Sequence, residues 1–178
     1  MVNRIKQLAT LAYVVAVGEK KLGMMGHTLL QKLFYLLQHG EGVNLGYKFK
    51  LHYYGPYCED LWSDLNYLDD QNVVKVIPSE SGYGYEITSG SASDDILKRF
   101  DSSLAPKIEK MLDLLGNEPV RRLEALATTH FVYRELQNRG QAGEQSLVVK
   151  KVLSLKPHLS TTVIEESLQI LQDNRLLK

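Results

Sequence analysis

The segment formed by residues 47–62 constrains the fold of this chain more than any other part of its sequence. Its first half alternates between an apolar and a polar face, formed by Phe49, Leu51 and Tyr53 and by Lys48, Lys50 and His52. This period of two predicts a short, half-buried β-strand. Gly55 and Pro56 follow, and we expect them to end the strand, because proline lacks a backbone N–H and glycine tolerates unusual backbone angles. Since proline also suits the first turn of a helix, the sequence predicts a helix over residues 57–70.

Helical patterns precede this segment and a hairpin pattern follows it. Apolar residues recur at helical spacing over residues 3–17 and 28–39, which predicts two helices. Two apolar runs at residues 73–77 and 85–88 flank a loop containing Ser and Gly, which predicts a β-hairpin. The order helix, helix, strand, helix, hairpin is that of a winged helix, which we expect in residues 1–90.

The second half of the chain is predicted to be helical. Apolar spacing indicates a helix over residues 94–115, in which Pro106 marks a candidate break, and a second over residues 145–155. It also indicates one helix that begins at residue 118 and one capped by Ser160. The predicted fold is therefore α+β and mostly helical, with a winged-helix-like N-terminal part and a helical C-terminal part, residues 91–178, packed on it. A chain of 178 residues also fits one single domain.

Composition narrows the classes of function. Lys+Arg and Asp+Glu both number 21, so the formal net charge is zero, whereas dedicated nucleic-acid binders are usually basic. The single cysteine excludes an internal disulfide framework and a cysteine-based zinc cluster, and it favours a reduced cytoplasmic setting. The apolar run at residues 8–17 is too short to span a bilayer and lacks a signal-peptide cleavage pattern. We therefore expect a cytoplasmic protein without a membrane partner.

Cys58 is the only thiol and the strongest candidate for a nucleophile. It is predicted in the first turn of a helix, where N–H groups stabilise a thiolate, and His52 precedes it across the Gly-Pro bend. Glu59 and Asp60 follow directly and favour the protonated thiol, so we expect a small structural residue.

Metal and phosphate sites lack their usual spacing. No two histidines stand four residues apart as in a helical zinc motif; they are His27, His39, His52, His130 and His158. No glycine-rich stretch leads into the Lys-Ser/Thr start of a phosphate-binding loop. We therefore predict no catalytic, cofactor-binding or metal-binding residues and no enzymatic activity, with a small thiol enzyme using Cys58 as the weaker alternative.

DNA binding is the main alternative function. In a winged helix the helix before the hairpin enters the groove, and here residues 57–70 contain Glu59, Asp60, Asp64, Asp69 and Asp70 but no Lys or Arg. Such a helix repels phosphates where DNA-binding proteins gain from counterion release. The hairpin, or Lys48 and Lys50 beside the aromatic residues of the segment, would have to make the contacts instead.

Two short motifs resemble a known family. Residues 30–37, Leu-Gln-Lys-Leu-Phe-Tyr-Leu-Leu, and residues 54–57, Tyr-Gly-Pro-Tyr, resemble the paired Leu-x-Lys-Leu-Leu-Tyr and Tyr-Gly-Pro motifs of the Panacea domain. That family includes antitoxins and a protease adaptor, and the chain looks most similar to its YwgA-like branch, bacterial and archaeal proteins without a settled function. The resemblance covers most of the chain, implies a winged-helix-like fold, and implies a lysine at position 32 but no catalytic residues.

The polar pair Gln31 and Lys32 lies on an otherwise apolar helix. We expect Gln31 to bond a nearby backbone group, whereas Lys32 either extends to the surface or forms a polar anchor under the turn at residues 54–56. Gly55 is expected where an added Cβ would clash. The predicted function is a non-enzymatic protein-interaction or regulatory module, antitoxin-like or adaptor-like. Its partner and its oligomeric state stay open, and its candidate interaction residues are Lys32, Tyr54, Gly55, Pro56, Tyr57, Glu59, Asp60 and Trp62.

Overall fold

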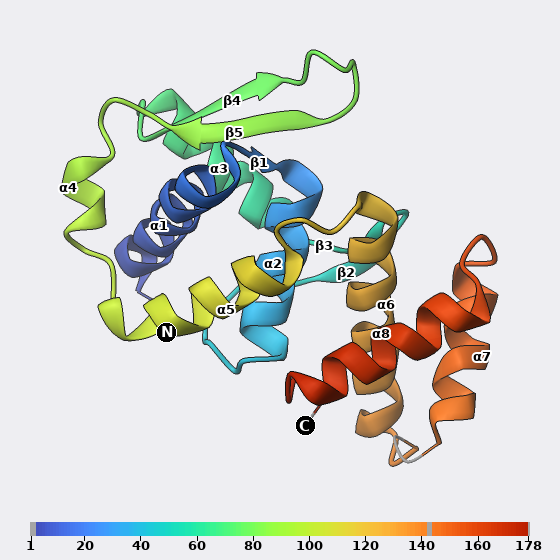
Figure 1. Cartoon of the computed structure of the whole chain (residues 1–178). Helices are drawn as coiled ribbons and strands as arrows, with labels where there is room; N and C mark the ends of the chain where they lie inside the picture. The colour runs from blue at the N-terminus through green and yellow to red at the C-terminus, as the bar shows by residue number, and fades with distance from the viewer. Residues whose placement is uncertain (1–2, 142–143, 178) are drawn as a thin grey trace.

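The computed structural model describes residues 3–141 and 144–177 and shows a mostly helical α+β fold (Figure 1). Its N-terminal part consists of α1 (Arg4–Leu22), β1 (Met25–Gly26), α2 (His27–His39), α3 (Glu59–Asp70), β4 (Val74–Pro78) and β5 (Tyr85–Ser89), together with a further hairpin described below. The three strands named here form an antiparallel sheet in the order β1-β5-β4. Helices and strands thus follow one another as in a winged helix, and the predicted fold class is confirmed.

The beginning of the chain differs from the prediction in two respects. β1 was not predicted, because a two-residue strand is too short to show a period; it pairs Met25 with Ile87. The helix predicted over residues 3–17 extends to Leu22. Gly18 continues the helix and leaves room for Met25, since a Cβ at Gly18 would lie 2.1 Å from the Met25 sulfur. Glu19 in the added turn accepts a hydrogen bond from the Ser89 N–H at 2.8 Å, which ties α1 to β5.

A second hairpin, absent from the prediction, lies between α2 and α3. β2 (Lys50–His52) and β3 (Gly55–Tyr57) are antiparallel, with Leu51 opposite Pro56. The expectation that the Gly-Pro pair ends the strand and begins a helix is therefore wrong. The pair forms the returning strand, and Cys58 is the N-cap of α3. In an antiparallel ladder, pairs of opposed residues that exchange backbone hydrogen bonds alternate with pairs that do not. Leu51 and Pro56 form a pair of the second kind, so the missing N–H of Pro56 leaves no ladder hydrogen bond unmade.

The C-terminal part is helical, as predicted. It comprises α4 (Asp94–Leu97), η1 (Ser102–Leu104), α5 (Ala105–Leu115), α6 (Val120–Asn138), α7 (Gln145–Leu155) and α8 (Thr161–Asp173). The helix expected over residues 94–115 is interrupted, and Pro106 lies in the first turn of α5, where its missing N–H is not needed. Met111, Leu126 and Leu171 belong to the same buried core as α1 and α2, so the two parts share one core. A smaller cluster fills the space among α6, α7 and α8.

Candidate functional site

The β2–β3 hairpin joins the two parts of the fold, because β3 contacts both α2 and α6 (Figure 1). Three buried charged side chains lie close to this hairpin: Lys32 of α2, Glu124 of α6, and Lys156, which follows α7. Only 2%, 3% and 6% of their surfaces are exposed. We refer to these three residues as the anchor cluster. Charges that leave water need hydrogen-bonding or ionic partners, and here the hairpin backbone supplies several of them.

Lys32 holds the returning strand. Its Nζ donates a hydrogen bond to the Pro56 carbonyl oxygen at 2.9 Å. Of the two interpretations left by the sequence, the polar anchor is therefore the one that the structure shows. Burial lowers the pKa of Lys32 to about 8; the Glu124 carboxylate opposes this change, and the Lys156 ammonium adds to it.

Lys156 holds the other side of the turn. Its Nζ donates to the His52 carbonyl oxygen at 2.8 Å and also to the Tyr53 carbonyl oxygen. It lies 3.2 Å from Glu124 Oε1, an ion-pair distance without the alignment of a hydrogen bond. The His158 Nε2 lies 3.0 Å from Glu124 Oε2. One carboxylate thus neutralises part of the positive charge that fixes the hairpin to the helices.

Gly55 brings the hairpin into contact with α6. Its φ of +89° lies in the region that favours glycine, and an added Cβ would lie 2.9 Å from Thr128 Oγ1 and 3.5 Å from Lys32 Cε. The expectation of a clash at this position is confirmed. The close approach also buries Pro56, so two of the candidate interaction residues belong to the support of the turn rather than to its surface.

Two tyrosines project from the turn. Tyr53 is 80% exposed and Tyr54 is 62% exposed. Tyr54 was a candidate interaction residue, but Tyr53 was expected on the half-buried face of the strand. That expectation is wrong, because the alternation of the strand ends at His52 and Tyr53 belongs to the turn. Two adjacent aromatic side chains are therefore exposed to solvent on a turn in which the His52 and Tyr53 carbonyl oxygens accept hydrogen bonds from Lys156. We refer to Tyr53 and Tyr54 as the tyrosine tip.

Tyr57 and Trp62 are half-buried and pack around a histidine. The centroid of the His27 ring lies 4.4 Å from that of Trp62, 5.8 Å from that of Tyr57 and 6.2 Å from that of Tyr85. Burial lowers the pKa of His27 to about 4, and the nearby Lys32 charge lowers it further. These rings come from β3, α3 and β5 and pack around the first residue of α2, whereas the tyrosine tip projects into solvent.

The acidic residues of α3 divide between the surface and the interior. Glu59 and Asp60 are exposed in its first turn, where the helix dipole favours negative charge. Asp64 is buried, with 3% of its surface exposed, and accepts hydrogen bonds from both terminal nitrogens of Arg4 and from the Tyr47 hydroxyl. Asp64, one of the acidic residues that the sequence places on this helix, therefore belongs to an internal ion pair and adds no charge to the helix surface.

Cys58 is enclosed and hydrogen-bonded through its backbone. Its exposed fraction is 1%, and the Gln31 side chain bonds both its N–H, at 2.9 Å, and its carbonyl oxygen, at 3.0 Å. Gln31 thus bonds a backbone group as predicted. Burial raises the pKa of the Cys58 thiol, with a smaller contribution from the Asp60 charge. His52 instead lies beside the Tyr57 ring, on the exposed face of β2, and makes no hydrogen bond to the thiol in the described part of the chain.

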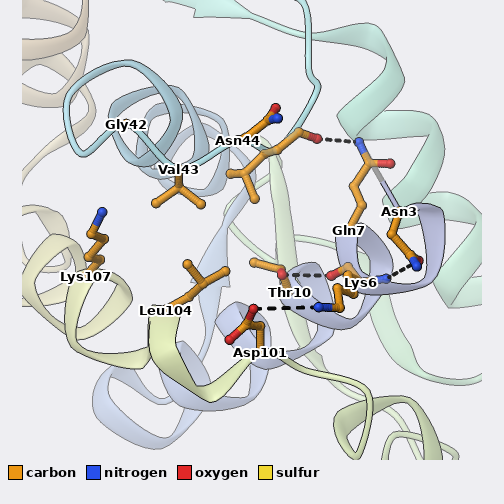
Figure 2. Close-up of a pocket in the computed structure, with 11 residues that line it drawn as sticks. Asn3, Lys6, Gln7, Thr10, Gly42, Val43, Asn44, Asp101, Leu104 and Lys107 are labelled. Atoms are coloured by element: carbon orange, nitrogen blue, oxygen red, sulfur yellow. Dashed lines mark hydrogen bonds and ion pairs between the residues drawn. The ribbon is translucent and has the colours of Figure 1, made fainter. Parts of the chain in front are cut away.

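A separate hollow of about 300 Å³ lies between α1 and the loop at residues 42–45 (Figure 2). Several of its polar side chains bond one another or the backbone: Gln7 Nε2 donates to the Leu45 carbonyl oxygen at 2.8 Å, and Lys6 Nζ lies 3.8 Å from Asp101 Oδ2. None of the candidate residues lies in this hollow.

Two further properties concern only the described residues. Residues 3–141 and 144–177 contain no group of three or more His, Cys, Asp or Glu side chains placed to hold a metal ion. Over the same residues, no helix combines the length and the apolar character that crossing a membrane requires.

The sequence interpretation did not identify Glu124, Lys156, His158 or Thr128 as part of this site. Glu124 had a recognisable signal, because it is a charge inside the apolar run Leu123–Ala127 of a helix whose neighbours are buried. Lys156 had no such signal in the sequence, because its hydrogen-bond partner His52 lies 104 positions earlier in the chain.

A scan against models of protein families finds none that matches this chain, and a search of curated proteins likewise finds no match. The resemblance to the Panacea domain therefore stays a prediction.

Proposed function

We propose that this chain is a non-enzymatic protein-interaction module that binds its partner through the tyrosine tip. The observation that supports the proposal is the combination of two exposed adjacent tyrosines with a backbone fixed by Lys32 and Lys156. Tyrosine is enriched among the residues that dominate binding energy at protein interfaces. A backbone that is already ordered loses little conformational entropy on binding, which raises affinity.

The partner class follows from the family resemblance as part of the same proposal. An antitoxin-like or adaptor-like module recognises another folded protein or a segment of one, and Glu59 and Asp60 next to the hairpin would add negative charge at the edge of the contact. We place the module in the cytoplasm, since its single thiol is buried and a disulfide is not needed to hold the fold.

Photo-crosslinking tests the proposal. A benzophenone amino acid replaces Tyr54 in the full chain, and the same replacement at Tyr83 serves as the matched control, because Tyr83 is 88% exposed on the unrelated β4–β5 turn. We expect one defined protein to be crosslinked from position 54 and not from position 83. Equal crosslinking from both positions, or none from position 54, contradicts the proposal.

A further inference from the structure

The two outer edges of the β2–β3 hairpin differ in their hydrogen bonding. Pro56 has no N–H, so the opposed residues Leu51 and Pro56 cannot exchange hydrogen bonds, and the ladder bonds must join the flanking pairs. The remaining backbone groups of both residues therefore point outward. On the β3 side the Pro56 carbonyl accepts from Lys32, and the edge has no donor left to satisfy.

The β2 side is open. The outward N–H and carbonyl of Leu51 have no hydrogen-bond partner among the described residues. An unpaired strand edge offers another chain a template for pairing, and folded proteins usually cover or charge such an edge. The register of this hairpin thus leaves one donor and one acceptor side by side on β2.

An apolar cavity lies beside this open edge. It has a volume of about 210 Å³, and its apolar lining includes Leu51, Phe131, Leu136 and Leu155. A second hollow of about 360 Å³ shares Leu51 and Leu155 and continues to Tyr53. Because they share these two residues, the two hollows adjoin beside β2 and extend from α6 to Tyr53 of the tyrosine tip; we refer to them together as the groove. Leu155 is 41% exposed in this groove, although it is a large apolar side chain.

The charges at the rim of the cavity are mostly positive. Arg139 Nη2 lies 3.7 Å from Glu135 Oε2, so the charges of these two side chains largely cancel. Lys151 also lines the cavity, is exposed, and makes no ion pair within residues 3–141 and 144–177. An acidic residue of a ligand would therefore find an unpaired partner at this rim.

We propose that the β2 edge binds an extended segment of a partner protein by strand addition, with a bulky aliphatic side chain in the cavity and an acidic residue at Lys151. Strand addition needs an unpaired edge for main-chain hydrogen bonds and a pocket for alternate side chains, and both occur here side by side. The inference rests on the proposed function and names the partner's binding element. The tyrosine tip at the end of the same groove provides the adjoining aromatic contact.

A displayed library of short random peptides, selected on the full chain, tests this inference. We expect enriched peptides to alternate aliphatic and acidic residues. We also expect a bound peptide to slow hydrogen exchange of the Leu51 amide on the order of tenfold or more, because that N–H becomes hydrogen-bonded. Enrichment of basic or helix-forming peptides, an unchanged Leu51 amide, or no enrichment at all overturns the inference.

Two pairs of variants locate the binding. Leu51→Pro removes the outward N–H without removing a ladder bond, and Leu51→Val keeps that N–H, so only the proline variant should lose the peptide. Lys151→Glu should weaken binding on the order of tenfold, whereas Lys150→Glu, an exposed neighbour outside the cavity, should leave it unchanged. Because the lysine variants do not alter the strand, they decide the question even if Leu51→Pro fails to fold. Equal binding by the two lysine variants contradicts the inference.

Sedimentation of the full chain tests the alternative occupant of the β2 edge, which is a second copy of this chain. A dimer that Leu51→Pro converts to a monomer would show that β2 pairs with a second copy, and the partner-peptide inference would fail. The two proposals can fail separately: a protein that is crosslinked from position 54 and binds Lys151→Glu with full affinity would keep the tyrosine tip as the interface and would overturn only the strand-edge inference.

Discussion

Replacing Gly55 by alanine should destabilise the fold through two additive effects. An L-residue at φ +89° costs about 1–2 kcal/mol. The new Cβ, 2.9 Å from Thr128 Oγ1, forces a shift in a packed site that costs a further 1–3 kcal/mol or so. The expected loss is therefore about 2–5 kcal/mol of unfolding free energy, measured by urea denaturation, and the melting temperature should fall by roughly 5–15 °C.

A double-mutant cycle separates the two effects. In a Thr128→Ala background the contact is removed, so the cost of Gly55→Ala should fall to the conformational part, about 1–2 kcal/mol. Thr129→Ala is the matched control, because Thr129 is equally buried, its hydroxyl also lacks a hydrogen-bond partner, and it is not among the atoms nearest to the new Cβ. A loss below about 0.5 kcal/mol, or one that Thr128→Ala does not reduce, would refute the close approach of the turn to α6.

Three further predictions concern the anchor cluster, the thiol and DNA. In the folded protein Lys32 loses its proton above about pH 8, whereas in the unfolded chain it keeps the proton to about pH 10.5. Between pH 8 and 9.5 the free energy of unfolding should therefore rise by roughly 2 kcal/mol relative to that of the Lys32→Met variant. A difference between the two proteins that stays constant over this range would contradict the buried ammonium. Native Cys58 should react with iodoacetamide far more slowly at pH 7 than it does in denaturant, because the thiol is enclosed and its pKa is raised; equal rates would reopen the thiol-enzyme alternative. Random duplex DNA at low salt should form no complex below about 10 µM, since α3 carries no Lys or Arg; salt-sensitive binding below about 1 µM would restore the DNA alternative.

The sequence predicted those helices and strands in which apolar residues recur at regular spacing. The amphipathic helices and the β4–β5 hairpin were found from their spacing, and α7 has the predicted bounds. β1 escaped prediction because its two residues are defined by pairing with β5 rather than by a pattern. The β2–β3 hairpin was missed because Gly55 and Pro56 usually interrupt a strand. Here the position opposite Leu51 needs no N–H, and the close approach to α6 requires a residue without Cβ.

The candidate site was predictable only where its partners are near in the chain. Lys32 was identified as a polar residue on an apolar helix, and its partner Pro56 lies 24 positions later, within the recognised motif pair. Lys156 and Glu124 come from the other half, and their proximity arises from the packing of α6 and α7 in the tertiary fold. Tyr53 was assigned to the wrong face because the strand pattern was extended into the turn.

The affinity of the protein crosslinked from position 54 provides the most direct test of the central claim. Isothermal titration would compare the unchanged chain with Tyr53→Ser/Tyr54→Ser and with the control Tyr83→Ser, which alters an exposed tyrosine on another turn. Loss of an interface hot spot of about 2 kcal/mol predicts binding roughly 30-fold weaker for the tip variant, with Tyr83→Ser unchanged. Equal affinities for all three proteins, each folded with the melting temperature of the unchanged chain, would contradict the account.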